Sequence, residues 1–174
     1  SSIVSLGMIE RSDIMNRDHL LPAAVVVICW GAVAVGVIAQ YAFDVEPCIL
    51  CTYQRVAYAV AGAVALAALF SKHRALILGG CAAVLLVGAG IAFYHVGVEQ
   101  HWWASVASCG GAPTTDLSLS DVLAQLNVKQ PKPCDEVDWT FLGVSMATYN
   151  VGVFLALAVA MARSGIKLRR EAAS

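Results

Sequence analysis

The sequence predicts an all-α membrane protein, a bundle of four transmembrane helices with a short amphipathic interfacial helix in its second outward-facing loop. Of its 174 residues, 59% are hydrophobic and 13% are charged, whereas a soluble domain is usually about 45–50% apolar and about 25% charged. The mean hydropathy is +0.73. This excess of apolar residues is too large for one soluble core, so most of the chain is expected to lie in lipid as a single membrane domain, residues 1–174.

Long uncharged runs mark the predicted spans. A helix needs about 20 apolar residues to cross the hydrocarbon core of a bilayer. Three uncharged runs cover residues 19–43, 75–94 and 139–162, and a shorter one covers 56–71. The shorter run falls short of a full crossing, so its helix is predicted to begin near Cys48 or Cys51. We place the four spans at about 21–43, 50–71, 75–94 and 143–162.

The distribution of Lys and Arg predicts the orientation, because cytoplasmic flanks of membrane spans are enriched in both. The side that holds residues 1–20, 71–74 and 163–174 carries eight of them: Arg11, Arg17, Lys72, Arg74, Arg163, Lys167, Arg169 and Arg170. The other side, with the loops 44–49 and 95–142, holds only Lys129 and Lys132, plus the borderline Arg55 at the start of the second span. Both termini are therefore predicted to be cytoplasmic. Residues 1–20 contain charges and no apolar stretch, so we expect no secretory signal peptide there.

The long loop is predicted to contain one helix. Within 115–128, Leu119, Val122, Leu123 and Leu126 fall at i, i+3, i+4 and i+7, which is the spacing of one helical face. Such a face is typical of a helix that lies on the membrane surface. A helix packed on its own loop is the equal alternative.

Six cysteines divide by their predicted depth. Cys29 and Cys81 lie in mid-span, where a thiol without a charged partner behaves as a small hydrophobe. The other four face outward: Cys48, Cys51, Cys109 and Cys134. Three interpretations of this set remain open, namely two structural disulfides in a non-enzymatic membrane scaffold, a four-thiolate metal site, and a redox relay.

Spacing favours the relay for the first pair, in the segment 46-EPCILCTYQR-55. A Cys-x-x-Cys disulfide closes a very small loop, so it stabilises a fold little. At a helix N-terminus, however, the partial positive charge favours a thiolate. On a helix, Cys48, Cys51 and Arg55 would share one face, and the permanent charge of Arg55 could stabilise a thiolate or a reduced acceptor. Snorkelling to lipid head groups is the alternative role for Arg55.

The second pair lies 25 positions apart, which disfavours a metal site, and none is predicted. Cys109 precedes two glycines and Cys134 lies in 130-QPKPCDE-136, so both are expected in accessible loop, where an outside thiolate can attack a disulfide. His95, at the end of the third span, could donate a hydrogen bond or proton to a bound acceptor, or could be an ordinary interfacial histidine. No dinucleotide or haem-attachment motif is present, and a lipid-soluble quinone fits as the electron acceptor.

These motifs together resemble the disulfide bond formation protein B family, DsbB. The resemblance rests on 47-PCILCTYQR-55, 94-YHVGVEQ-100, the two loop cysteines and 141-FLGVSM-146, and it covers residues from about 20 to 165. It implies a four-helix bundle in the bacterial inner membrane, with loops 44–49 and 95–142 in the periplasm.

The resemblance also implies an activity, that of a protein-dithiol:quinone oxidoreductase. A DsbA-like thioredoxin-fold oxidase would attack a Cys109–Cys134 disulfide at Cys109. Electrons would then pass to a Cys48–Cys51 disulfide, with Cys51 facing ubiquinone or menaquinone. By position, Arg55 and His95 would be the quinone-binding residues.

Overall fold

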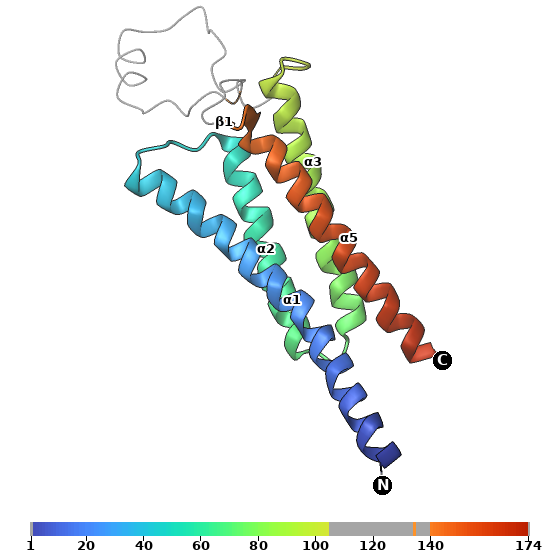
Figure 1. Ribbon diagram of the computed structural model, residues 1–174. Coiled ribbons are helices and arrows are strands. Elements are labelled where there is room, and N and C mark those ends of the chain that lie inside the picture. The colour runs from blue at the N-terminus through green and yellow to red at the C-terminus, as the bar shows by residue number, and fades with distance from the viewer. Residues whose placement is uncertain (1, 105–133, 135–139, 174) are drawn as a thin grey trace, which may run out of the picture.

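Four long helices form the protein in a computed structural model, which describes residues 2–104, 134 and 140–173, with side chains from residue 19 onward. The helices are α1 (Ser2–Ala42), α2 (Ile49–Phe70), α3 (Arg74–Glu99) and α5 (Met146–Ala173). Each contains a segment long and apolar enough to cross a membrane, which in α1 is His19–Ala42. Figure 1 shows the helices running along one long axis, with the N- and C-terminal ends of the chain at the same end of the bundle. The predicted fold class, an all-α membrane protein with four spanning helices, is confirmed.

Small side chains line the contacts between helices. α3 packs against both α2 and α5, whereas α1 packs chiefly against α2. On α2 the buried alanines Ala57, Ala61, Ala65 and Ala68 recur every three or four residues, so they form one face. Small residues let helix backbones approach closely, which is how helices associate in membranes without a hydrophobic driving force. Large apolar side chains such as Phe70 and Leu76 are exposed instead, as expected of a surface that faces lipid.

The third helix is longer than predicted. The sequence predicts a span that ends at Tyr94 and a loop that begins at residue 95. In the structure α3 continues through Glu99. The side chain of Glu99 is only 6% exposed and has partners within the bundle, so its charge does not force the helix to end.

A short hairpin before α5 was not predicted. β1 (Thr140–Phe141) pairs antiparallel with β2 (Val144–Ser145). The two residues between them, Leu142 and Gly143, have φ of 52° and 77°. Positive φ at both central residues is the requirement of a two-residue hairpin turn whose twist matches that of the strands. The predicted amphipathic helix at 115–128 lies outside the described residues.

The contact between α3 and α5 leaves no room at Gly88. A Cβ atom at this position would lie 2.5 Å from Cε1 of Phe154. Phe154 is fully buried and stacks on Tyr58 with ring centroids 4.0 Å apart, so it has no space to move. We expect Gly88→Ala to lower the free energy of unfolding by about 1–3 kcal/mol, the usual cost of overpacking a core.

Thermal unfolding in detergent, followed by circular dichroism, measures this effect. Gly90→Ala, on the same helix, is the matched control, because a Cβ there meets nothing within 4 Å. It should be neutral or slightly stabilising, since Ala has the higher helix propensity. Equal transition temperatures for the two variants would contradict the packing argument.

Candidate functional site

The first cysteine pair lies at the start of α2. Cys48 is the N-cap residue, with extended backbone (φ −68°, ψ 167°), and its sulfur accepts a hydrogen bond from the backbone N–H of Cys51 at 3.3 Å. The two Sγ atoms are 3.0 Å apart, and the structure has both residues as free thiols. Cys48 is 3% exposed, whereas Cys51 is partly exposed. The pair therefore lies where the N-terminal amides of a helix stabilise negative charge on sulfur.

Cys48 holds its thiol proton strongly. The Cys48 thiol donates to the sulfur of Cys51, and this hydrogen bond, together with burial, raises the pKa of Cys48 to about 12. A protonated thiol is a poor nucleophile, because only the thiolate attacks. In the reduced protein Cys48 thus acts as hydrogen-bond donor to Cys51.

This arrangement predicts a pH dependence for alkylation. In the reduced protein, modification of Cys48 by iodoacetamide should rise only as the pH approaches 12, since its thiolate is absent at lower pH. Cys51→Ala removes the hydrogen bond that contributes most to the raised pKa, so the midpoint for Cys48 should move to lower pH. Mass spectrometry of the peptide that contains residue 48 gives the midpoint. Cys51→Ser keeps a hydroxyl acceptor and should shift it less; an unchanged midpoint in Cys51→Ala would contradict the assignment.

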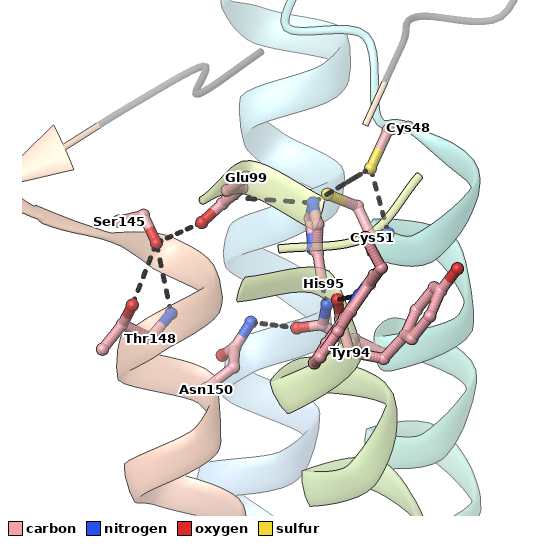
Figure 2. A network of polar contacts seen from close by, with 10 residues as sticks. Cys48, Cys51, Tyr94, His95, Glu99, Ser145, Thr148 and Asn150 are labelled. Carbon is pink, nitrogen blue, oxygen red and sulfur yellow. Dashed lines mark hydrogen bonds and ion pairs between the residues drawn. The ribbon is translucent and has the colours of Figure 1, made fainter. Parts of the chain in front are cut away.

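His95 on α3 faces the cysteine pair. Its Nε2 lies 3.6 Å from Cys48 Sγ, and its Nδ1 lies 2.9 Å from Nε2 of Gln54 on α2. Gln54 Oε1 accepts a hydrogen bond of 2.7 Å from Asn150 on α5, and the Asn150 Oδ1 accepts one of 3.1 Å from Tyr58. Asn150 of α5 and His95 of α3 are labelled in Figure 2, and Gln54 of α2 connects them through these two contacts. The ring is therefore held so that Nε2 is directed at the sulfurs.

A carboxylate completes the surroundings of His95. Glu99 lies one turn later on α3, with Oε1 3.7 Å from His95 Nε2, and both side chains are 6% exposed. Ser145 Oγ donates to Glu99 Oε2 at 2.5 Å and also accepts from the backbone N–H of Thr148 at 3.3 Å. Ser145 thus caps α5 and positions the carboxylate (Figure 2).

Cys134 is the one described cysteine of the long loop, and it lies against the first pair. It is 2% exposed and packs with Cys48, Leu50 and Val98. Burial raises the pKa of its thiol, while the backbone N–H groups of Ile49 and Leu50 act in the opposite direction. Cys109 lies outside the described residues, so the pairing of Cys109 with Cys134 stays a prediction.

Arg55 lies on the side of α2 that faces α1, whereas His95 approaches α2 from α3. Its Nη1 donates to Oε1 of Gln40 on α1 at 2.7 Å, and its guanidinium lies over Gly36, where a Cβ would be 2.7 Å from Nε. The predicted single face of Cys48, Cys51 and Arg55 is therefore only partly present, because Cys48 is the N-cap rather than a helical residue. Arg55 still follows Cys51 by one turn.

Sequence reasoning missed four residues of this site: Gln54, Glu99, Ser145 and Asn150. One signal was available, since Glu99 follows His95 by four positions and Gln54 follows Cys51 by three, which are spacings that share a helical face. Asn150 and Ser145 gave no such signal, because their role depends on how α5 packs. Cys29 and Cys81 are fully buried in the bundle core, as expected.

The described geometry supports thiol chemistry. Three potential ligand atoms, Sγ of Cys48, Sγ of Cys51 and Nε2 of His95, lie within 4.8 Å of one another. Cys134 packs beside them, so three of the four cysteines that the sequence predicts to face outward meet at one point. An exchange of disulfide bonds between the loop and the start of α2 requires this proximity.

Comparison with known proteins agrees with the arrangement. The family model described as disulfide bond formation protein DsbB matches residues 18–163. Disulfide bond formation protein B of Xylella fastidiosa (strain Temecula1 / ATCC 700964) is 30% identical over 153 residues, 82% of this chain and 87% of the relative. The proteins of that name from Polaromonas sp. (strain JS666 / ATCC BAA-500) and Polaromonas naphthalenivorans (strain CJ2) are each 32% identical, over 84% and 91% of this chain and 89% and 98% of the relatives. The chain is therefore a member of the disulfide bond formation protein DsbB family.

Proposed function

We propose that the protein reoxidises a reduced, DsbA-like thioredoxin-fold oxidase and passes the electrons through two cysteine pairs to a membrane quinone. Membership of its family supports a role in disulfide bond formation. The observation that carries the finer proposal is the packing of Cys134 against Cys48 at the start of α2. A loop cysteine at this position can exchange with the Cys-x-x-Cys pair without large movement.

The electrons move by a series of thiol–disulfide exchanges, each of which forms one S–S bond and breaks another. A thiolate of the partner attacks Cys109 of a Cys109–Cys134 disulfide and releases Cys134 as the leaving thiolate. The partner's second thiol then resolves the mixed disulfide, and the partner leaves oxidised. Cys134 attacks Cys48 of a Cys48–Cys51 disulfide, which releases Cys51. Cys109 next re-forms its bond with Cys134 and frees Cys48, so the two electrons now reside on the reduced Cys48–Cys51 pair.

The last step needs an acceptor at Cys51. A bound quinone, ubiquinone or menaquinone, supplies a sink for two electrons and two protons. The residues fit such a group, because Arg55 and His95 can both donate hydrogen bonds to carbonyl oxygens, and they flank Cys51 from the α1 side and the α3 side. The protons come from the two thiols, and the imidazole of His95 lies 3.6 Å from the sulfur of Cys48, which supplies one of them.

The proposed location is the bacterial inner membrane, with both termini in the cytoplasm. The bias of Lys and Arg toward one side supports this orientation. Cys48, Cys51 and Cys134 would then face the periplasm, where disulfides persist.

Quinone reduction by the purified protein tests the proposal. The protein in detergent is mixed with a reduced DsbA-like oxidase and either a ubiquinone or a menaquinone analogue, and quinone absorbance is followed with partner thiols. We expect one quinone consumed for each partner dithiol oxidised. Partner oxidation without quinone loss would contradict the proposed acceptor, and absence of both would contradict the activity.

A further inference from the structure

The cluster of Cys48, Cys51 and His95 has the spacing of a tetrahedral metal site. Zn²⁺ binds cysteine sulfur at about 2.3 Å and histidine nitrogen at about 2.0 Å, so tetrahedral ligand atoms lie about 3.5–3.8 Å apart. Cys48 Sγ and His95 Nε2 are 3.6 Å apart. The two sulfurs, at 3.0 Å, would separate by a fraction of an ångström, which rotation of the partly exposed Cys51 side chain allows.

The imidazole is held beside the sulfurs by polar partners. Gln54 Nε2 donates to Nδ1 at 2.9 Å, and Gln54 Oε1 accepts from Asn150 at 2.7 Å, so the neutral ring carries its proton on Nε2. Metal-binding histidines usually donate their second ring N–H to a polar acceptor, which fixes the orientation of the ring. Binding of an ion at Nε2 would therefore move the ring proton to Nδ1, where Gln54 would accept it through Oε1 once its amide has turned over.

The charges around the cluster favour a cation. Glu99 lies beside His95 with a side chain only 6% exposed, and ionisation of the two thiols adds further negative charge. The opposing charge is that of Arg55, one turn after Cys51, and its guanidinium is engaged by Gln40 on α1 at 2.7 Å. Thiolate and imidazole together select soft or borderline metals such as Zn²⁺ over Mg²⁺ or Ca²⁺.

We propose that the reduced protein binds one Zn²⁺ ion, or a similar thiophilic divalent ion, through Cys48, Cys51 and His95. Two thiols lose their protons as the ion binds, so binding releases two protons and weakens at low pH. No electron is transferred. A Cys48–Cys51 disulfide offers no thiolate, so metal binding and oxidation of the pair exclude one another. The effect on turnover rests on the proposed function: bound metal would keep the Cys48–Cys51 pair reduced and stop turnover.

The sequence disfavours a metal site made of cysteines alone. Cys109 and Cys134 would have to complete the ligand set, and they lie 25 positions apart. The structure supplies His95 from another helix as the third ligand. The position of α3 beside α2 therefore changes the inference.

Cobalt binding tests the proposal without reference to turnover. The full-length protein in detergent is reduced, freed of reductant under anaerobic conditions and titrated with Co²⁺, whose thiolate charge-transfer and visible bands report tetrahedral sulfur ligation. We expect one Co²⁺ per chain, displaced by Zn²⁺. Cys48→Ser, Cys51→Ser and His95→Ala should each remove or greatly weaken the bands, and Gln54→Ala should weaken affinity about 10- to 100-fold through loss of ring orientation.

Cys29→Ser is the matched control, because Cys29 is a buried thiol remote from the cluster, and it should bind Co²⁺ as the parent protein does. Circular dichroism of each variant shows whether its helices are intact. Unchanged Co²⁺ bands in helical Cys51→Ser and His95→Ala proteins, or equal binding by the oxidised protein, would overturn the proposal. The parent protein should also lose quinone reduction in Zn²⁺ and regain it with a chelator. If no turnover exists at all, the proposed function fails while the cobalt titration still decides the metal site.

Discussion

Cys51→Ser is expected to reduce quinone reduction to its uncatalysed background, a loss of roughly 1,000-fold or more, as for removal of an essential nucleophile. The substitution leaves Cys48 without its redox partner 3.0 Å away, so no disulfide can re-form at the start of α2. The serine hydroxyl is close in size to the thiol and keeps the helix N-terminus intact. Turnover is measured as quinone consumption with a reduced DsbA-like oxidase in excess.

Two controls separate chemistry from folding. Cys81→Ser changes a buried thiol in the bundle core, whose only described hydrogen bond is to the Ala61 carbonyl, and should retain most activity. In Cys51→Ser, about one partner dithiol per chain should still be oxidised in a single turnover, because the loop pair is unaltered. Parent-like turnover in Cys51→Ser would remove the relay from consideration.

Arg55→Ala is expected to raise the apparent KM for quinone by about 10- to 100-fold with a smaller change in kcat. A hydrogen bond from a charged donor contributes about 1.5–3 kcal/mol, and its loss affects binding of the acceptor. Arg55→Lys should recover part of the affinity, since it keeps the charge but loses the planar fork of donors. Initial rates at varied quinone concentration separate KM from kcat.

A second variant tests the position of Arg55 without removing it. In Gly36→Ala the new Cβ would lie 2.7 Å from Nε of Arg55, so the guanidinium must shift, and KM should rise in the same direction by a smaller factor. Gly31→Ala, on the same helix, meets nothing within 4 Å and should leave KM unchanged. A quinone KM that is the same in Arg55→Ala as in the parent would exclude Arg55 from the acceptor site.

The sequence predicted the elements whose signals are local. Four apolar runs of membrane-spanning length correspond to four helices, and Cys48 and Cys51 lie at the start of α2 as their spacing and flanking residues indicated. His95 could be named from its place at the end of a span. Its contact with Cys48 depends on how α3 packs on α2, and that packing is set by small residues such as Ala61 and Ala92 rather than by any motif.

The unpredicted parts arise from burial of polar groups. A carboxylate is costly in lipid, yet α3 continues past the predicted end at Tyr94 and through Glu99, because Ser145 and His95 lie against that carboxylate. The hairpin of β1 and β2 is too short for periodicity to reveal, and it depends on the positive φ of Leu142 and Gly143 at its turn. Asn150 lies in an apolar stretch with no motif around it. Its hydrogen bond to Gln54, 96 positions earlier, forms only in the assembled bundle.

That long-range amide contact bears on biogenesis. During synthesis α2 and α3 are complete before α5 emerges, so Gln54 can meet His95 while the residue that fixes the other end of its amide is still unmade. Insertion of the final helix supplies Asn150 to Gln54 and Ser145 to Glu99. A chain truncated before Met146 would therefore carry the Cys48–Cys51 pair with an imidazole that is not yet held in place. We therefore expect the dithiol to reach its full reactivity only after the last helix has entered the membrane.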